Sequence, residues 1–179
     1  ARVYSLGSEL EVNRFFRRRI NVSQKTQPIA EPIAREAILA EIEALRPDQR
    51  ICSQMEFDVF LVAAAQAPHI LREIGRLREV TFREVGEGTG QPTDLDEYDL
   101  YYLHLFLWDR EARCIAGAYR LGKGDEIMLK YGKKGFYIHS LFKMKAGMEP
   151  VLSQAVELGR SFILKSYQRK RLSLFLLWK

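Results

Sequence analysis

The 179-residue chain has only two cysteines and no apolar run long enough to cross a bilayer. Cys52 and Cys114 lie far apart and lack the spacing of a metal-binding pair, so we expect free thiols in a reducing compartment and no metal site. The longest apolar runs, such as residues 174–178, fall far short of the roughly 20 residues of a membrane-spanning helix. The first residues also lack the charged start and apolar centre of a signal peptide. These absences predict a cytoplasmic protein that is soluble or is held peripherally on the inner face of the cytoplasmic membrane.

The chain also lacks internal repeats and low-complexity segments, and its 47% hydrophobic content is enough for one domain with a sizeable core. Its net charge of +5 favours an acidic partner, and three kinds come into question: an anionic membrane surface, an acidic carrier protein or nucleic acid. No known nucleic-acid-binding module accompanies the basic segments, which argues against nucleic acid. Charge alone does not choose between the other two partners.

The spacing of apolar residues predicts a mixed sheet flanked by helices, which is an α+β or α/β architecture. We interpret residues 1–50 as an N-terminal arm or linker and a helix that follow an upstream domain, and residues 51–179 as the domain itself. The first helix is expected to have Pro32 at its first position and Pro47 just after its end. The elements expected after it are a strand at 57–65, a helix at 68–85, a hairpin of strands at 101–109 and 113–121, a short strand near Phe136, a helix before Ala155, a strand at 155–163 and a final helix. Where the last strand leads into that final helix, we expect a parallel strand pair.

One charged residue lies on the apolar face of the second helix. Arg78 shares that face with Ile74, Phe82 and Val85. The face is otherwise apolar and is expected to pack on the sheet. A buried guanidinium needs carboxylate partners, and the segment just after the helix supplies several. These acidic residues are Asp94, Asp96, Glu97 and Asp99. Such a cluster is also typical of a solvated loop, and that interpretation stays open.

Three further charged residues lie in or at the ends of predicted strands. Arg120 ends the second strand of the hairpin, and Glu157 and Arg160 lie in the last strand. Residues three apart in a regular strand face opposite sides, but Gly159 would allow a bulge or twist that brings both side chains toward one cleft. Together with Arg78, these residues indicate a polar pocket, and a purely structural salt-bridge network is the alternative.

Four motifs in this order resemble those of a known fold family. They are Arg78-x-x-x-Phe82, Asp94-x-Asp96-x-x-Asp99, Gly117-x-x-Arg120-Leu121 and Glu157-x-x-Arg160. The pattern resembles acyl-homoserine-lactone synthases and bacterial lipid N-acyltransferases of the ornithine-lipid type, which share the GNAT acyltransferase fold. The segments EIGRLREVTFREVGEGTG, DLDEYDLYYLHLFLWD, GAYRLG and ELGRSF are more similar still to bacterial proteins labelled hemolysins, in which this domain follows a fused glycerophospholipid-type acyltransferase domain. The resemblance covers about residues 57–179.

The resemblance implies a GNAT fold that is incomplete at its C-terminus, because the family continues with further strands. It also implies an acyl thioester donor beside the last strand, with the donor's phosphates at the N-terminus of the next helix. The residues at the corresponding phosphate loop are Gln168, Arg169, Lys170, Arg171 and Ser173. Because Arg171 and Ser173 replace the family's small residues, the loop favours an acyl carrier protein, whose acidic surface suits its basic residues, over tightly bound acyl-coenzyme A. No bound cofactor is expected.

Amide formation from a thioester needs a base for the amine proton and hydrogen-bond donors for the oxyanion. With the resemblance as a guide, Glu157 accepts the amine proton, directly or through a water. Asp96, Asp99 and Arg120 complete the catalytic set by orienting the cationic acceptor and holding the carboxylates. The residues assigned to substrate binding are Arg78, Phe82, Asp94, Arg160, Leu158, Ser161 and Phe162, and backbone N–H groups at 158–162 hold the thioester oxygen.

The resulting hypothesis is an N-acyltransferase that moves a fatty acyl group from acyl carrier protein, or from acyl-CoA, to the amine of an amino acid or small amine in aminolipid synthesis. Glycine and ornithine are the first acceptors to consider. The alternatives are an acyl-homoserine-lactone-type signal synthase and a non-catalytic module that binds carrier protein or membrane. His104 and Asp109 match the spacing of a glycerolipid acyltransferase motif, but residues five apart on a strand face opposite sides, so we expect no joint role.

Overall fold

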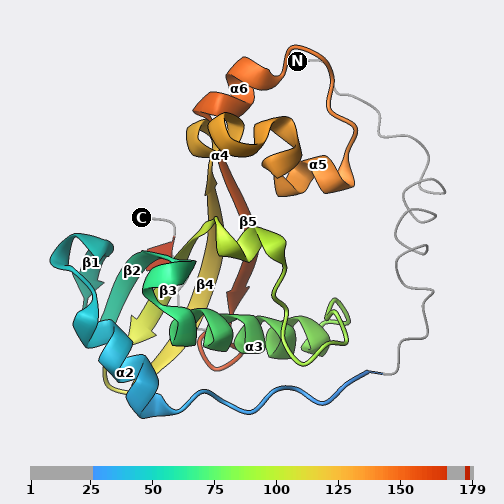
Figure 1. Ribbon diagram of the computed structural model, residues 1–179. Helices are drawn as coiled ribbons and strands as arrows, with labels where there is room; N and C mark the ends of the chain where they lie inside the picture. Colours follow the sequence, from blue (N-terminus) through green and yellow to red (C-terminus); the bar gives the residue numbers. More distant parts are fainter. Residues whose placement is uncertain (1–25, 169–175, 178–179) are drawn as a thin grey trace.

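The computed structural model describes residues 26–168 and 176–177 of the chain, and it contains one five-stranded sheet (Figure 1). The strands are β1 (Arg50–Gln54), β2 (Phe57–Ala63), β3 (Leu103–Asp109), β4 (Cys114–Lys123) and β5 (Val156–Ile163). They lie side by side in chain order, and every neighbouring pair is antiparallel. Helices flank this sheet, so the expected α+β class is confirmed.

The expected parallel pair is wrong for the strands that the structure describes, because β5 runs antiparallel to β4. The chain leaves β4 at Lys123 and enters β5 at Val156, and these two residues are partners in the ladder. The intervening segment therefore starts and ends at the same edge of the sheet. A parallel pair would need a crossover back along the full length of the strand.

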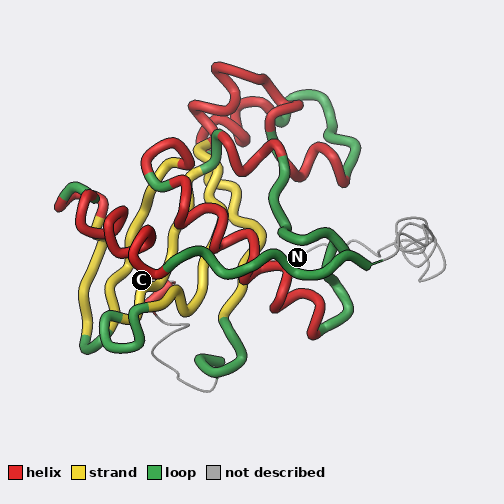
Figure 2. The backbone as a smooth tube through the Cα atoms, turned by 60° about the horizontal axis from the view of Figure 1, so that its bottom comes forward, coloured by secondary structure: helices red, strands yellow, loops and turns green. Residues whose placement is uncertain are grey.

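Helices α2 (Arg35–Ala44) and α3 (Pro68–Glu84) cover one face of the sheet, and Figure 2 shows both in front of the strands. The core between these layers is formed by buried apolar residues: Ile38, Phe60, Val62, Ala67, Ile70, Ile74, Leu77, Phe106, Trp108, Ile115, Ala118 and Phe162. The expected amphipathic helix at 68–85 is confirmed by α3, except that Val85 lies just after its end and is exposed. Because α2 contributes Ile38, it belongs to the same packed body as the sheet.

The first helix starts later than expected, since α2 begins at Arg35 and not at Pro32. Residues before it are held extended by hydrogen bonds to other parts of the chain. The backbone N–H of Ala30 donates to the Pro92 carbonyl at 3.0 Å, and that of Ile33 donates to the Glu73 carboxylate at 3.2 Å. These contacts fix the segment along α3, so the helix forms only after it.

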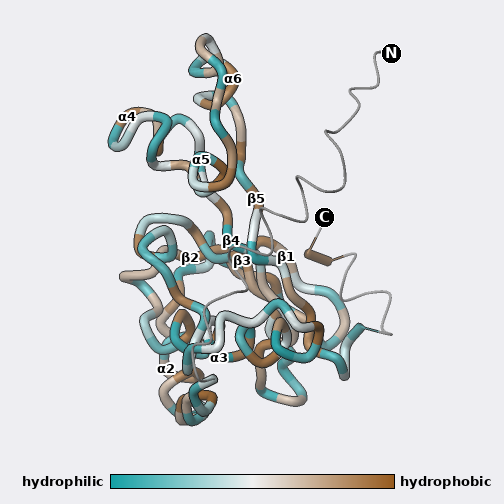
Figure 3. Tube along the Cα trace, turned by 90° about the vertical axis from the view of Figure 1, so that its right-hand side faces the viewer, coloured by the Kyte–Doolittle hydropathy of each residue, from teal (hydrophilic) through white to brown (hydrophobic). Residues whose placement is uncertain are grey.

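A lobe of three helices lies between β4 and β5 and projects from the sheet (Figures 1 and 3). It contains α4 (Gly124–Tyr131), α5 (Tyr137–Leu141) and α6 (Glu149–Gln154), and we call residues 124–155 the helical lobe. The strand expected near Phe136 is wrong: this residue precedes α5 and is buried with Tyr102 in the lobe's own core. It has the apolar neighbours that suggest a strand but no ladder partner.

The other predicted elements agree with the structure. The strand at 57–65 and the hairpin at 101–121 are present as β2, β3 and β4, and the helix before Ala155 is α6. The sequence interpretation missed α4 and the edge strand β1. Most residues of both elements are exposed, so neither shows the apolar periodicity that marks a buried helix or strand. Within the part of the chain that the structure describes, no helix has both the length and the apolar character to cross a bilayer. The final helix expected after β5 falls largely outside the described residues.

Candidate active site

Arg78 of α3 is the central cation of a buried charge cluster. Its two terminal nitrogens donate to the Asp99 carboxylate at 3.1 and 2.7 Å, which is the two-pronged geometry that strengthens arginine–carboxylate pairs. Its Nε lies 3.2 Å from Asp94 Oδ2, and Nη2 also donates to the Asp94 backbone carbonyl. The predicted carboxylate partners of a buried Arg78 are therefore present.

Two more arginines reach the same carboxylates from neighbouring strands. Arg120 of β4 is buried and contacts Asp96, and it lies 3.3 Å from Asp99. Arg160 of β5 lies 3.3 Å from Asp94 and 3.7 Å from Asp96. Three arginines and three aspartates thus meet with balanced formal charge, as is needed for ions removed from water.

The spacing of Asp96 and Asp99 follows from the short helical turn that they cap. The Asp96 side chain accepts hydrogen bonds from the backbone N–H groups of Tyr98 and Asp99, at 3.0 and 3.3 Å. In return, the Asp99 carboxylate accepts the Asp96 N–H at 2.9 Å. This reciprocal capping of the short helical turn Glu97–Leu100 aims both carboxylates at the arginines. The motif is therefore ordered and is not a solvated loop.

A cage of tyrosines surrounds the outer side of the cluster, and the sequence interpretation missed it. The Arg120 guanidinium lies 5.0 to 5.5 Å from the ring centroids of Tyr98, Tyr102 and Tyr137, and Arg160 lies 5.3 Å from Tyr137. These distances suit cation–π attraction, which favours a charged arginine in a site with little water. The adjacent tyrosines in EYDLYY were the available signal, but tyrosine spacing alone is equally typical of a core.

Glu157 of β5 joins the cluster to the helical lobe. Its carboxylate accepts hydrogen bonds from the backbone N–H groups of Tyr137 and Ile138, at 3.0 and 2.7 Å, and from the Tyr102 hydroxyl. Burial and the nearby Glu157 carboxylate raise the pKa of Tyr102 above its usual range, so this phenol stays protonated and donates. Glu157 therefore caps the first turn of α5.

A bulge in β5 brings Glu157 and Arg160 to the same face of the sheet. Arg120 pairs with Gly159, but Ala118 pairs with Phe162, so Arg160 and Ser161 together stand opposite one residue of β4. Such an extra residue reverses the alternation of side chains. The expected bulge is present, and the left-handed residue in it is Arg160, with φ of 51°, and not the neighbouring glycine.

The buried charges shift the acid–base behaviour of the cluster. Burial alone would raise the pKa of Asp99, but hydrogen bonds and positive charge from Arg78 and Arg120 outweigh it and hold that pKa below its usual range. Burial raises the pKa of Asp94 despite nearby Arg78 and Arg160. Burial opposes the charge on Arg120, but Asp99 and Asp96 raise its pKa, so it stays ionised. Asp94 is therefore easier to protonate than Asp99 when the pH falls.

A known domain family matches the part of the chain that carries this cluster. The match is to the acetyltransferase (GNAT) domain family and covers residues 77–179, which is more than half of the chain. The chain belongs to the GNAT family. The expectation of a GNAT fold is thus confirmed, and every arginine and aspartate of the cluster lies within the matched range.

Two curated relatives of this GNAT domain are named glycine N(alpha)-acyltransferase. The protein from Phocaeicola vulgatus is 36% identical over 152 residues, which cover 81% of this chain and 46% of the relative. The protein from Bacteroides thetaiotaomicron is 35% identical over 152 residues, covering 81% of this chain and 44% of the relative. The chain thus spans less than half the length of either relative. No solved structure matches it.

The remaining predicted site residues of the GNAT domain lie apart from the cluster or outside the described residues. Phe82 and Phe162 pack in or against the hydrophobic core, so their side chains support the sheet. Leu158 and Ser161 are exposed on the opposite side of β5 from Glu157. Gln168 is exposed, and its side chain donates to the Ile163 carbonyl at 3.0 Å. The other members of the expected phosphate loop, Arg169, Lys170, Arg171 and Ser173, lie outside the described residues.

His104 and Asp109 occupy separate environments in the GNAT domain, as the strand geometry predicts. His104 is buried and its Nε2 lies 2.9 Å from the Asp99 carbonyl, whereas Asp109 accepts the Tyr167 hydroxyl at 2.8 Å. Burial lowers the pKa of His104, so it is neutral near pH 7. Among the residues that the structure describes, no group of three or more histidine, cysteine or acidic side chains is placed to hold a metal ion.

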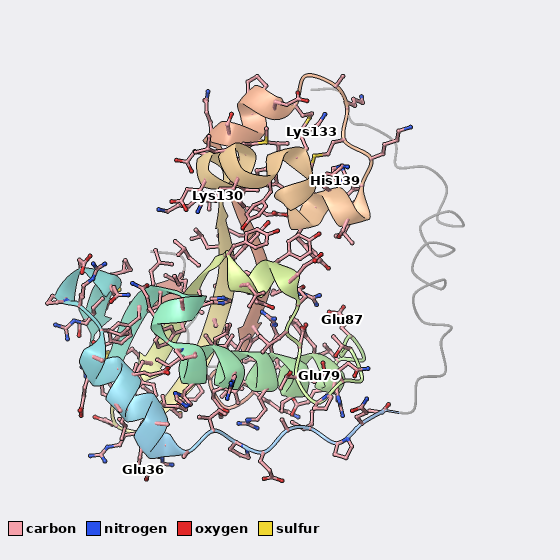
Figure 4. All side chains as sticks on the ribbon, viewed as in Figure 1. Glu36, Glu79, Glu87, Lys130, Lys133 and His139 are labelled. Carbon is pink, nitrogen blue, oxygen red and sulfur yellow. The ribbon has the colours of Figure 1, made fainter. Side chains whose placement is uncertain are left out.

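The buried carboxylate of Glu79, on α3, leads to a prediction about how the stability of the fold depends on pH (Figure 4). Burial opposes its ionisation, but Arg83, Thr89 and Gly90 donate to its carboxylate at 2.6 to 2.9 Å and lower its pKa. A carboxyl with a lowered pKa adds stability above its ordinary pKa, and that stability is lost as the pH falls through the folded value. We therefore expect Glu79→Gln to lower the free energy of unfolding at pH 7 by about 1–3 kcal/mol.

The variant should converge with the wild type as the pH falls below about 4.5, the ordinary pKa of the group. Urea unfolding at pH 7, 5 and 3 measures the difference. Glu87→Gln is the matched control, because Glu87 is exposed and no contact of its side chain is seen among the described residues (Figure 4). A constant difference at all three pH values would contradict the assignment.

Proposed function

We propose that this GNAT domain is an N-acyltransferase that moves a fatty acyl group from a thioester to the amine of glycine or another small amino acid. The observation that supports this most directly is that Arg120 and Arg160 both form ion pairs with Asp96 beside the bulge in β5. Family membership supports acyl transfer, and the names of the two curated relatives support a glycine acceptor. Use of the product in aminolipid synthesis is part of the same proposal.

An amino acid carries both charges that the site can hold. Asp96 is the most accessible aspartate of the cluster, with 27% of its side chain exposed, and it is suited to attract the ammonium group. Nη2 of Arg120 and Nε of Arg160 are buried and have no hydrogen-bond partner among the described residues. A buried donor without a partner is unfavourable, so an arriving carboxylate that accepts from it gains affinity. We assign the acceptor's carboxylate to this side of the cluster.

Glu157 is the proposed proton acceptor. The acceptor amine must lose a proton before or while its nitrogen attacks the thioester carbonyl. Three donors already hold the Glu157 carboxylate, which leaves part of its accepting capacity for a water or for the amine. The nitrogen–carbon bond then forms, the carbon–sulfur bond breaks as the tetrahedral intermediate collapses, and the departing thiolate takes up the proton that Glu157 accepted.

The bulge in β5 supplies the proposed oxyanion site. A bulge leaves backbone groups outside the regular ladder, and here Arg160 and Ser161 stand opposite a single residue of β4. A backbone N–H placed where negative charge develops on the thioester oxygen stabilises the transition state. This proposal keeps the backbone of 158–162 in the site while leaving the Leu158, Ser161 and Phe162 side chains outside it.

The donor is proposed to be acyl carrier protein or acyl-CoA. The function is tested by incubating the intact protein with palmitoyl-carrier protein or palmitoyl-CoA and single acceptors, with mass spectrometry of the products. We expect N-palmitoyl glycine as the main product, and glycinamide, which lacks the carboxylate, to react at least about tenfold more slowly because a charged hydrogen bond is lost. Equal rates for both would remove the carboxylate assignment.

A second set of outcomes decides the class of activity. Release of an acyl-homoserine lactone from S-adenosylmethionine would replace the proposal by a signal synthase. Absence of any amide product with either donor and with glycine, ornithine or ethanolamine would favour a non-catalytic module and overturn the proposal. Asp96→Asn serves as the matched loss-of-function control, because the amide keeps the shape of the side chain while removing its charge.

A further inference from the structure

Five lysines are concentrated in the middle of the helical lobe, whose net formal charge over residues 124–155 is +2. Residues 127–148 contain five lysines and neither aspartate nor glutamate, so their formal charge is +5 with histidine neutral. The net charge of the whole chain is also +5, so the rest of the sequence is balanced. We call residues 127–148 the basic run. In Figure 4, Lys130, Lys133 and His139 lie on the lobe, whereas Glu36, Glu79 and Glu87 lie at the other end of the molecule.

Most of these lysines are available to an outside partner. Lys133 is paired with Glu149 at 2.6 Å. The other four are exposed, and within residues 26–168 no carboxylate lies at ion-pair distance from them. These four are Lys130, Lys134, Lys143 and Lys145.

Large apolar side chains are exposed on the same lobe. Leu129 of α4 has 86% of its surface exposed, and Phe142, just after α5, has 64%. Ile138 and Val151 are also exposed. Single exposed apolar residues are ordinary on protein surfaces, but here they alternate along the chain with unpaired lysines. The combination of basic and apolar residues is typical of surfaces that insert shallowly into lipid headgroups.

The shape of the lobe favours a bilayer over a protein partner. The lobe stands away from the sheet as a projection (Figures 1 and 3). Phe142 and Lys143, just after α5, line an open hollow of about 350 Å³ on this lobe. A fluid lipid surface adapts to such an irregular face, whereas a folded protein partner needs a matching one. We propose that the basic run of the helical lobe docks this protein on an anionic membrane surface through its four unpaired lysines, Leu129 and Phe142.

The lobe also borders the candidate active site, so docking on a membrane would place that site near the lipid surface. Tyr137 lies within the basic run, its ring contacts Arg120 and Arg160, and its N–H binds Glu157. A lobe bound to lipid would therefore hold the reacting groups next to the bilayer, where a fatty acyl amide partitions. This advantage rests on the proposed function, but the docking itself does not.

Vesicle binding tests the proposal without any measurement of activity. The intact protein is sedimented with phosphatidylcholine vesicles that contain about 30% phosphatidylglycerol, an anionic content that gives a strong negative surface potential. Pure phosphatidylcholine vesicles serve as the comparison. Each lysine near such a surface contributes roughly fivefold in partitioning. We expect replacement of all four unpaired lysines by glutamine to weaken binding to the anionic vesicles by roughly 100-fold or more.

Matched controls separate a specific surface from general charge. Replacing four exposed arginines outside the lobe by glutamine removes the same formal charge. This variant should change binding less than about fivefold, because salt screens the attraction of charges that are not held at the lipid surface. The control positions are Arg35, Arg46, Arg72 and Arg113. Leu129→Ser with Phe142→Ser should weaken binding by roughly tenfold or more, whereas Ile51→Ser with Met55→Ser, at exposed positions of β1 and its turn, should not.

Each outcome bears on one claim. Equal loss in the lysine and arginine variants would overturn the docking surface in favour of non-specific attraction. Absence of vesicle binding together with lobe-dependent binding to acyl carrier protein would also overturn it, because the partner would then be the carrier. Vesicle binding by a protein that forms no amide would leave the docking surface in place and remove the proposed function.

Discussion

Replacing Arg78 by methionine is expected to lower the free energy of unfolding by about 3–5 kcal/mol. Methionine fills a similar volume, so the loss arises from charge and not from a cavity. The change leaves the buried Asp99 and Asp94 without their main cation, and it alters the balance of the cluster from three arginines and three aspartates to two and three. Urea unfolding monitored by circular dichroism measures the difference.

Restoring the balance provides the control for this prediction. In Arg78→Met combined with Asp99→Asn, two arginines again face two aspartates, and the asparagine keeps the shape of the turn. We expect the double variant to be more stable than the sum of the two single changes by about 0.5–3 kcal/mol. Strict additivity would mean that Arg78 and Asp99 do not act as a pair, and the buried network would need another explanation.

Glu157→Gln is expected to lower kcat for amide formation by about 10²- to 10⁴-fold, as for the loss of a general base. The substrate KM should change little, because Glu157 is assigned to the proton and not to acceptor binding. The amide oxygen of glutamine still accepts one of the two α5 backbone N–H groups, so most of the lobe contact is kept. Steady-state kinetics with glycine and a palmitoyl donor separate the two parameters.

Tyr102→Phe is the matched control for the base. It removes one hydrogen bond to Glu157 while the carboxylate stays in place. We expect a decrease in kcat of less than about tenfold, because the two backbone N–H groups of α5 still hold the carboxylate in place. If Glu157→Gln lowers kcat no more than Tyr102→Phe does, Glu157 is a cap of α5 and a positioning residue, and the proton goes elsewhere.

The buried charge cluster was predictable because isolated charges in a core need partners. Arg78 lies on the apolar stripe of a long helix, and the acidic segment that follows the helix supplies several carboxylates that can neutralise it. The spacing of Asp96 and Asp99 then has a local cause in the turn that they cap. Strong helical periodicity and electrostatic necessity were thus sufficient for the centre of the site.

The outer wall of the site could not be predicted in the same way. Tyr137 reaches Glu157 and Arg120 only because the lobe folds back on the end of β5, and that contact depends on tertiary packing between short elements. Short helices such as α4 have weak periodicity, and the apolar residues around Phe136 fit a strand equally well. Likewise, the direction of β5 depends on where the helical lobe ends, and the residues of β5 alone do not indicate that direction.

The pairing of Lys123 with Val156 has a consequence for how the protein can vary. The whole helical lobe is inserted at a single point between two adjacent antiparallel strands, like an enlarged hairpin connection. Insertions, deletions or exchanges within it leave the register of all five strands unchanged. The sheet can therefore keep its strand register while the lobe that covers the charged cluster is remodelled.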